Sequence, residues 1–353
     1  MTTLERFAKE LPGNVDCVLV TCELHQMYLT GFPFTDGYVL VGHDHAWLLT
    51  DFRYIEAAKK FESDDLTVLM FQNRDNLLGK IIEENGFGII GYEDDRLICS
   101  ELDALKKRFT RCTFVPCGGI LQTLRTVKTP EEMEKMTKAQ RIAEKALERL
   151  LTLMTPDMTE IDVALELDYG MRKFGAEDRA FETIAVSGSA SSMPHGVPRN
   201  TVLQPGFLTM DFGARVDGYL SDMTRTIVIG QADDEMKKVY DTVLEAQRAA
   251  LDYVAAGKTG YECDKVARDI INGAGYEGCF GHSLGHGVGI EIHELPRLSS
   301  KWDRPLEVGA VVTVEPGIYI EGKYGVRIED MVWLGENGTV NMTKAPKELI
   351  ELF

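Results

Sequence analysis

The sequence predicts two domains, an α/β domain in the first third of the chain followed by an α+β domain. Short apolar strands alternate with helical stretches up to about residue 124. A helix start signal near residue 129 then marks a boundary, and beyond it long amphipathic helices are interleaved with strands. We therefore expect domains over residues 1–124 and 128–353, and a chain of 353 residues can bury two such cores.

In the first domain, the alternation follows from the residue types. Apolar, β-branched runs predict strands at 17–21, 37–50, 66–71 and 88–93, and amphipathic spacing predicts helices at 54–61 and 76–85. Three histidines of this domain lack other candidate ligands in their sequence context, which favours structural or exposed roles. They are His25, His43 and His45.

The second domain begins with a clear helix signal. Thr129 can cap the helix, Pro130 fits its first position and Glu132 completes a Thr-x-x-Glu capping box. A buried stripe that includes two methionines carries this helix to about residue 154. Further helices are expected over residues 160–174, 234–256 and 262–274, with strands between them.

A hairpin in the second domain brings two aspartates together. Asp217-Gly218 between two β-like runs predicts a two-residue turn of the primed type. Counting back from this turn, Gly213 faces Asp222, and Asp211 is a diagonal neighbour on the same face, roughly 7 Å away at the backbone. The two carboxylates can then share metals, and the glycine leaves room for an ion. The alternative is a pair of solvated residues on an open sheet face.

Two glutamates and three histidines extend this pattern. Glu315 in GAVVTVEPGIYI and Glu329 in GVRIEDMVW stand in apolar β-rich segments, where an unpaired carboxylate is costly to bury unless a cation meets it. His282, His286 and His293 cluster in the glycine-rich GHSLGHGVGIEIHELPR, which predicts an extended segment rather than a helix. Oxygen-rich ligation with one imidazole suits Mn, Co, Zn or Fe(II) at a paired site.

Three further residues are candidates for contacts with a ligand. Arg327 shares a strand face with Glu329, and the alternative is an ordinary surface ion pair, which suits Arg327 better than Glu329. Arg297 follows the histidine cluster, and its alternative is an exposed loop arginine. His195, in the loop SMPHGVPRN, is a weak signal by itself.

Composition excludes several classes of function. The net charge of −18 would repel a phosphate backbone, so we expect no nucleic-acid partner. No apolar stretch approaches membrane-spanning length and the first residues are charged, so we expect no membrane association and a cytoplasmic location. Seven irregularly spaced cysteines without a Cys-x-x-Cys pair fit neither a disulfide framework nor a zinc ribbon.

The motifs together resemble the pita-bread metallopeptidases, the family of methionine aminopeptidase, aminopeptidase P and prolidase. SDMTRT after the hairpin, HGVG around His286, VEPGIY around Glu315 and GVRIED around Glu329 stand in the family's order, and they are closest to its proline-specific branch. The first third resembles the creatinase-type N-terminal domain, so the likeness covers essentially the whole chain. The implied fold is an α/β creatinase-like domain followed by an α+β pita-bread domain.

The resemblance also implies ligands and roles. Asp211 would bind one metal, His286 and Glu315 the other, and Asp222 and Glu329 both. By that likeness His195, His282 and His293 would handle the substrate and the transition state. Beyond the resemblance, Glu315 is our candidate for the proton shuttle, and Arg297 and Arg327 are our candidates for further substrate contacts. The implied cofactors are two divalent ions, Mn with Co, Zn or Fe as alternatives. The implied substrates are Xaa-Pro dipeptides or short Xaa-Pro peptides, cleaved before proline by a metal-activated water, and the implied assembly is a homodimer.

Other functions remain open on the same fold. A creatinase-like hydrolase would work without metal, and a non-catalytic binding module would have lost ligands, whereas all five ligand positions are present here. A methionine-aminopeptidase-like enzyme would usually lack the first domain. Neither the choice between dipeptidase and aminopeptidase nor the preferred metal follows from the sequence.

Overall fold

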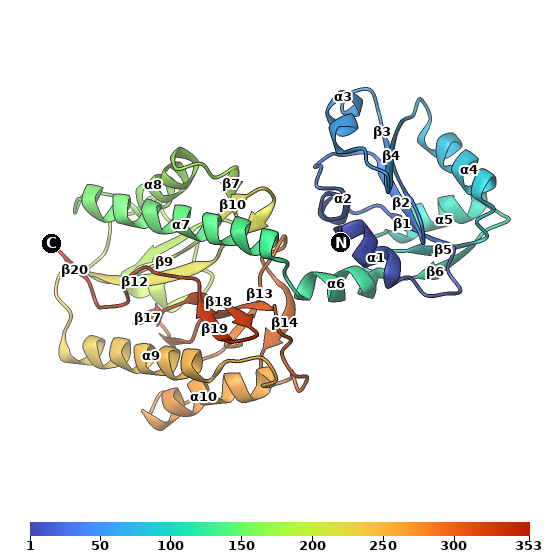
Figure 1. Cartoon of the computed structure of the whole chain (residues 1–353). Coiled ribbons are helices and arrows are strands. Elements are labelled where there is room, and N and C mark those ends of the chain that lie inside the picture. The colour runs from blue at the N-terminus through green and yellow to red at the C-terminus, as the bar shows by residue number, and fades with distance from the viewer. The chain divides into compact units, whose positions relative to one another are not determined.

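The structure, a computed structural model, describes all residues from 1 to 353 and divides into two compact units (Figure 1). Unit 1 is Met1–Arg125 and unit 2 is Thr126–Phe353. Both parts of the expected fold class, α/β and then α+β, are confirmed. None of the helices is both long enough and apolar enough to span a membrane.

Unit 1 is a six-stranded mixed sheet with the strand order β4-β3-β2-β1-β5-β6. Strand β1 pairs parallel with β5 and antiparallel with β2, so the sheet grows outward from it in both directions. Residues of α4 and α5 such as Leu78 and Leu105 pack on Cys17 and Leu19 of β1. The elements are α1 (Thr3–Lys9), β1 (Cys17–Val20), α2 (Glu23–Thr30), β2 (Tyr38–Gly42), β3 (Ala46–Thr50), α3 (Ile55–Ala58), η1 (Lys59–Phe61), β4 (Leu66–Met70), α4 (Arg74–Asn85), β5 (Ile89–Tyr92), α5 (Cys99–Arg108), β6 (Thr113–Pro116) and α6 (Gly118–Thr126).

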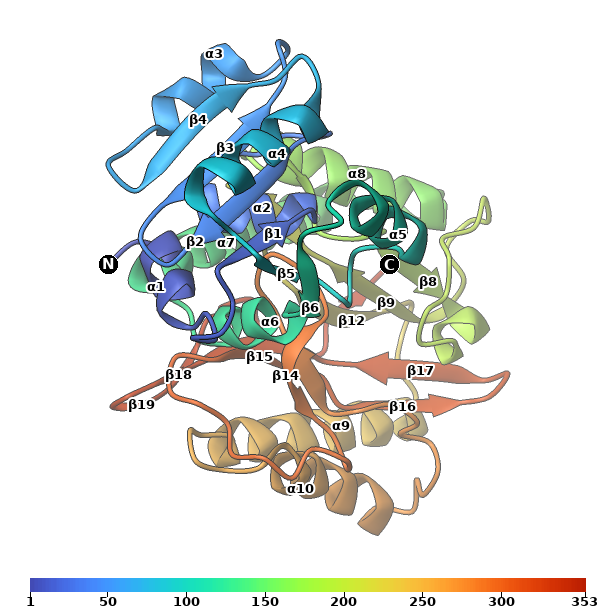
Figure 2. The ribbon, with the colours of Figure 1, turned by 90° about the vertical axis from the view of Figure 1, so that its right-hand side faces the viewer.

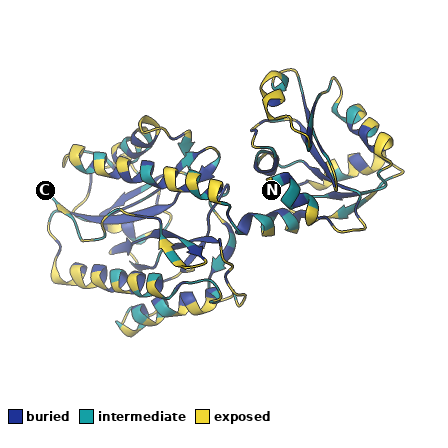
Figure 3. Cartoon of the chain, viewed as in Figure 1, coloured by how far each residue is buried: buried dark blue, intermediate teal, exposed yellow.

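Unit 2 places its strands between two pairs of helices. Figure 1 shows α7 and α8 on one side of the strands and α9 and α10 on the other, and Figure 2 shows the same arrangement after a quarter turn. One core cluster joins α7 and α8 to β9 and β12, and a second joins α9 and α10 to β15, β17 and β18. In Figure 3 the strands are dark blue and the outer faces of the helices are yellow, as this layering requires.

The helices of unit 2 are α7 (Pro130–Leu153), α8 (Glu160–Lys173), η2 (Gly188–Ser192), α9 (Asp234–Tyr253) and α10 (Gly260–Gly273). The strands are β7 (Asp178–Arg179), β8 (Ile184–Ser187), β9 (Gly206–Phe212), β10 (Ala214–Val216), β11 (Tyr219–Leu220), β12 (Met223–Ile229), β13 (Gly285–Gly287), β14 (Glu294–Leu298), β15 (Val311–Val314), β16 (Gly317–Ile320), β17 (Tyr324–Arg327), β18 (Asp330–Gly335), β19 (Gly338–Asn341) and β20 (Glu351–Leu352).

The start of α7 agrees with the sequence, whereas the end of α9 differs from it. The capping box at the start of α7 is confirmed, with the Thr129 side chain accepting from the Glu132 amide and the Glu132 carboxylate accepting from the Thr129 amide. The expected end of α9 at Ala256 is wrong by three residues. Val254 already has extended dihedrals, and the Gly257 amide donates to the Leu306 carbonyl, so Gly257 belongs to the following turn and not to the helix cap.

The hairpin of β10 and β11 has the predicted turn and register. Asp217 and Gly218 both have positive φ, as a type I′ turn requires, and the pairing continues without a bulge through β9 and β12. The expected room for an ion at Gly213 is wrong. A Cβ there would lie 1.9 Å from the Ser221 carbonyl oxygen and 3.1 Å from the Ala180 side chain, so the neighbouring backbone fills that space.

Candidate metal centre

The five expected metal ligands reach one pocket of unit 2 from different strands. Asp211 lies on β9, Asp222 directly before β12, His286 on β13, Glu315 directly after β15, and Glu329 between β17 and β18. The pocket has a volume of about 400 Å³. It is also lined by Phe181, Glu182, Ile184, Pro194, His195, His282, Ser283, Gly285, Ile292, His293, Arg297 and Arg327, so it contains every substrate residue expected from the sequence.

The His286 ring presents a lone pair to two carboxylates. Its Nδ1 lies 3.1 Å from the Gly287 carbonyl oxygen, which can only accept, so the proton is on Nδ1. Its Nε2 is 3.3 Å from Glu315 Oε1 and 3.6 Å from Asp222 Oδ2. Burial lowers the pKa of His286 to about 3, which keeps the ring neutral. A lone pair facing carboxylate oxygens is repulsive unless a cation lies between them.

Two carboxylates lie deeper than the others. Asp222 and Glu329 are buried, and together with His286 each offers a ligand atom within 4.8 Å of the other two. Burial first, and then repulsion by the neighbouring carboxylates, raises the pKa of both groups well above the ordinary value. One hydrogen bond partly offsets the cost of burying these charges: the Thr224 hydroxyl donates to Glu329 Oε2 at 2.7 Å.

Glu315 stands at the open side of this group. Burial raises its pKa to about 8, and the Arg327 guanidinium only partly opposes that rise. The Thr313 hydroxyl donates to Glu315 Oε1 at 3.1 Å and accepts from the His286 amide at 3.0 Å. It therefore fixes Glu315 and His286 relative to one another. A carboxyl with a pKa near neutrality can both release and accept a proton at working pH.

Only one of the two carboxylate oxygens of Asp211 has a hydrogen-bond partner. Arg327 Nη2 donates to Asp211 Oδ2 at 2.7 Å, while Asp211 Oδ1 is buried and has no hydrogen-bond partner. Arg327 itself is buried, so the alternative of a surface ion pair is wrong. An orphaned carboxylate oxygen beside three further carboxylates is a position that a cation would satisfy.

A chain of hydrogen bonds connects Arg327 to His282. Arg327 Nη1 donates to the Tyr319 hydroxyl at 2.7 Å, and that hydroxyl lies 2.9 Å from His282 Nε2, whose other nitrogen donates to the Ser283 carbonyl. Tyr319 therefore donates to His282 and orients both neighbours. Tyr319 was not among the residues expected from the sequence, although it lies only four residues after Glu315, on β16.

The remaining candidates surround the mouth of the pocket. His293 and His195 are exposed, and the His293 ring lies 4.4 Å from the His286 ring, centroid to centroid. Partial burial of the ring within the pocket and the Arg297 charge lower the pKa of His293, so its ring is neutral at neutral pH and can donate an N–H. Arg297 is the strand partner of His286 and lines the same pocket.

These observations fit a metal centre. The candidate ligands are four carboxylates and the Nε2 lone pair of His286. Asp211 Oδ1 has no hydrogen-bond partner, and burial, followed by the neighbouring carboxylates, raises the pKa of the other three carboxyls. Oxygen ligands with one imidazole suit divalent first-row metals. Divalent cations would restore the charge balance that the protein's own donors leave incomplete.

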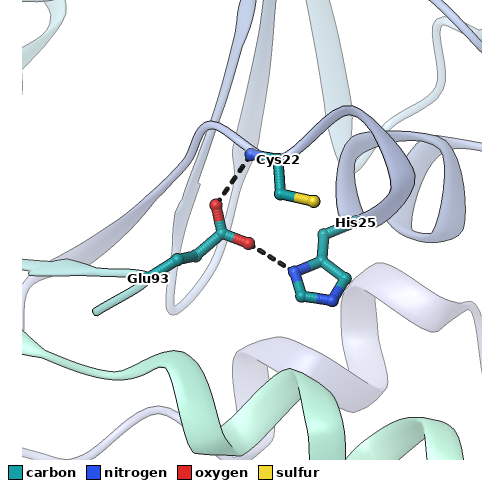
Figure 4. A group of neighbouring side chains, drawn as sticks. All are labelled: Cys22, His25 and Glu93. Carbon is teal, nitrogen blue, oxygen red and sulfur yellow. Dashed lines mark hydrogen bonds and ion pairs between the residues drawn. The ribbon is translucent and has the colours of Figure 1, made fainter. Parts of the chain in front are cut away.

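A second cluster of similar residue types lies in unit 1. Figure 4 shows Cys22, His25 and Glu93 pointing toward one another. Arg125 Nη1 lies 2.7 Å from His25 Nε2, and since a guanidinium can only donate, Nε2 accepts and Nδ1 donates its proton to Glu93. The other Glu93 oxygen accepts from the amides of Thr21 and Cys22. The donors and acceptors of this cluster are balanced without a metal.

The fold and the donor set of unit 2 define a metal-dependent hydrolase of the pita-bread class. The profile of "Metallopeptidase family M24" matches residues 134–336, and that of the "Creatinase/Prolidase N-terminal domain" matches residues 5–127. The chain belongs to metallopeptidase family M24. It is a metal-dependent peptidase, and the creatinase-type and pita-bread assignments of its two units are confirmed.

Relatives match over nearly the whole chain. An Xaa-Pro dipeptidase of Pyrococcus furiosus is 38% identical over 98% of this chain and 99% of its own. The solved structure of an Xaa-Pro dipeptidase from Bacillus anthracis has a TM-score of 0.95 at 41% identity and covers 99% of both chains. An X-Pro aminopeptidase from Thermotoga maritima has a TM-score of 0.93 at 37% identity, with 98% of this chain and 99% of that chain covered.

Proposed function

We propose that this protein hydrolyses the peptide bond before proline, in Xaa-Pro dipeptides or at the N-terminus of Xaa-Pro peptides. The observation that carries the proposal is the pocket in which four carboxylates and His286 Nε2 converge beside three histidines and two arginines. The similarity of the whole chain to proteins named as Xaa-Pro dipeptidases and aminopeptidases supports the substrate class.

Two divalent ions would occupy this pocket in the proposed enzyme. Asp211 would hold one and His286 and Glu315 the other, while Asp222 and Glu329 would contact both. When bound, such ions lower the pKa of a water toward neutrality and polarise the substrate carbonyl. Manganese is the proposed metal because oxygen donors predominate, with Co, Zn or Fe as alternatives.

The chain's own residues would carry the protons and orient the substrate. Glu315 takes a proton from the attacking water and delivers it to the imino nitrogen of the leaving proline. His293, neutral and exposed to the pocket, donates its N–H to the oxygen of the attacked carbonyl. His282 is held by Tyr319, and Arg327 is held against Asp211, so both present fixed faces to the substrate.

Proline requires a site of its own. The bond before proline is a tertiary amide without an N–H, so an enzyme cannot bind it through the backbone hydrogen bonds of an extended β-strand. The loop that carries Pro194 and His195 lines the pocket and is proposed as part of the wall against the proline ring.

Arg297 is proposed to distinguish dipeptides from longer peptides. A dipeptidase must bind the free carboxylate that follows proline, and a guanidinium can do so with two parallel hydrogen bonds. Arg297→Ala should therefore lower kcat/KM for an Xaa-Pro dipeptide roughly 10-fold or more and spare the matched Xaa-Pro-Yaa tripeptide. Equal losses on both substrates would remove Arg297 from carboxylate recognition.

Product analysis of the parent protein tests the function itself. The metal-loaded protein is incubated with Xaa-Pro, Xaa-Pro-Yaa and Xaa-Ala peptides, and the released amino acids are quantified. Release of Xaa from the proline peptides and not from Xaa-Ala is expected. Cleavage of Xaa-Ala at an equal or greater rate would contradict the proposal, and preference for the tripeptide would assign an aminopeptidase.

Location and assembly complete the proposal. The homodimer is proposed from the family resemblance. The cytoplasmic location is proposed because all seven cysteines are free thiols and the composition is acidic. Sedimentation equilibrium of the purified protein measures the assembly directly, and a mass equal to one chain would contradict a dimer.

A further inference from the structure

A buried ion pair connects the start of unit 2 to the strand that follows His293. Lys128 Nζ donates to Glu294 Oε1 at 2.6 Å, and the two side chains are 1% and 5% exposed. The backbone of Lys128 is fixed, because its amide donates to the Gly309 carbonyl at 2.9 Å and Thr129 caps α7 directly after it. The ammonium therefore reaches Glu294 from a rigid support.

The Glu294 carboxylate lies against the loop of residues 288–293, which connects β13 to β14. A Cβ on Gly289 would lie 2.3 Å from Glu294 Oε1, so the carboxylate packs directly on that Cα, and Oε2 lies 3.5 Å from the Glu291 amide nitrogen. On another side, the Leu220 amide of β11 donates to the Gly289 carbonyl at 2.8 Å. The loop is thus held between the hairpin and the carboxylate.

This loop carries His293 into the pocket. His293 immediately precedes Glu294, and its ring lies 4.4 Å from that of His286. Because the two residues are consecutive, the place of the Glu294 carboxylate constrains the backbone from which the His293 imidazole projects. A shift of the carboxylate would move the imidazole relative to the substrate carbonyl.

Stability alone is a poor reason for this ion pair. Two charges taken out of water lose hydration that their attraction only roughly repays, and an apolar pair of similar volume is often as stable. We propose instead that Lys128 and Glu294 are positioning residues, whose ion pair fixes the 288–293 loop so that His293 faces the reacting carbonyl. This inference rests on the proposed function, since the role of His293 does.

Two variants separate positioning from stability. Lys128→Met should lower kcat on an Xaa-Pro peptide by about 10- to 100-fold with KM within about twofold, because a displaced catalytic group is costly at small distances. The double variant Lys128→Met with Glu294→Met removes both charges, so its melting temperature should return toward that of the parent. Its kcat should stay low, because the carboxylate that packs on Gly289 is then missing and only the Leu220 side of the loop remains held.

Amide hydrogen exchange provides a readout that does not depend on activity. In both variants, exchange across residues 288–293 should be at least about 10-fold faster than in the parent, as expected when a local contact is lost. Glu144→Gln is the matched control, since it removes a buried carboxylate paired with Arg141 and bonded to the Lys344 amide. That control should lower the melting temperature and leave kcat and loop exchange unchanged.

The outcomes are distinct. A double variant with parental kcat and parental loop exchange would overturn the positioning role and leave the pair as a fold-stabilising contact. A parent protein that cleaves no Xaa-Pro peptide would refute the proposed function, and loop exchange would still decide whether the ion pair fixes the loop. If Lys128→Met alone does not fold, the double variant carries both measurements.

Discussion

Two buried clusters of this chain both contain His and Glu, but they differ in the balance of hydrogen-bond donors and acceptors. In unit 1, Glu93 and His25 are matched by Arg125 and by two backbone amides, so every lone pair that faces inward meets a donor. In unit 2, four carboxylates meet one guanidinium and two threonine hydroxyls, and His286 adds a further lone pair.

Proximity of possible ligands alone does not define a metal site. Both clusters bring His and Glu within coordinating distance. Only the cluster of unit 2 has more acceptors than donors, and burial and mutual repulsion raise the pKa values of its carboxyls. The excess of acceptors over donors is the feature that calls for cations.

Removal of metal should have the largest effect and should separate the two clusters most sharply. Chelation is expected to abolish Xaa-Pro cleavage, and added Mn or Co to restore it, because the water then loses its activating cations. Elemental analysis should find two ions per chain in the parent, fewer in His286→Ala, and an unchanged number in Cys22→Ser. Loss of an ion from Cys22→Ser would contradict the assignment of the metal site to unit 2, and full activity of metal-free protein would contradict the need for metal.

Glu-to-Gln substitution in the unit 2 cluster should have the next largest effect. Glu315→Gln keeps the shape of the side chain and removes the base, so kcat should fall by about 10² or more while the fold survives. Steady-state kinetics with circular dichroism decide this. A variant that turns over at close to the parental rate would show that Glu315 is not the proton carrier.

The same substitution in unit 1 should act on stability. Glu93→Gln removes the charge of the carboxylate that accepts from His25 and from the Thr21 and Cys22 amides, and the free energy of unfolding should fall by roughly 3 kcal/mol. Urea unfolding measures the loss. The metal content should remain that of the parent, and a variant with parental stability but a missing ion would reverse the roles assigned to the two clusters.

The smallest expected effect is a pH dependence confined to metal-free protein. The folded pKa of Glu315 is about 8, above its ordinary value of 4.5, so between these values the folded state binds more protons than the unfolded state. Stability should then fall as pH rises through this window, by at most about 1.4 kcal/mol per pH unit for this carboxyl. Asp222 and Glu329 are raised in the same direction.

Urea unfolding at about pH 7, 7.5 and 8, with and without Mn, measures this dependence. Below about pH 6.5 the lowered pKa values of His282 and His286 act in the opposite direction, because the unfolded state then binds more protons at these rings. Metal-loaded protein should lack the downward trend, because the cations stabilise the ionised carboxylates that the free protein must protonate. Metal-free protein that is most stable at the highest of these pH values would contradict the raised pKa values.

Local sequence signals were sufficient for much of the fold. Thr129, Pro130 and Glu132 predicted the start of α7, and Asp217-Gly218 predicted the hairpin turn and the register that carries Asp211 beside Asp222. Such signals depend on dihedral preferences and hydrogen bonds within a few residues, which tertiary packing here leaves in place.

Other local inferences were wrong because the deciding atoms are distant in sequence. Gly213 appeared to make room for an ion, yet the Ser221 carbonyl and Ala180 occupy that space. The helix of α9 was expected to continue to residue 256, but Val254 is already extended and the Gly257 amide donates to the Leu306 carbonyl. A glycine in a sequence indicates that a side chain is excluded, and only packing shows what excludes it.

The sequence by itself therefore determined the fold class, the order of the domains, the start of α7, the hairpin turn and the residues that could serve as ligands, since these follow from periodicity, turn chemistry and residue type. Only the tertiary structure decided how those residues are balanced. The contact of Tyr319 with His282 and the pairing of Lys128 with Glu294 join residues 37 and 166 positions apart. Whether a buried charge is satisfied depends on such long-range partners, and no local pattern encodes them.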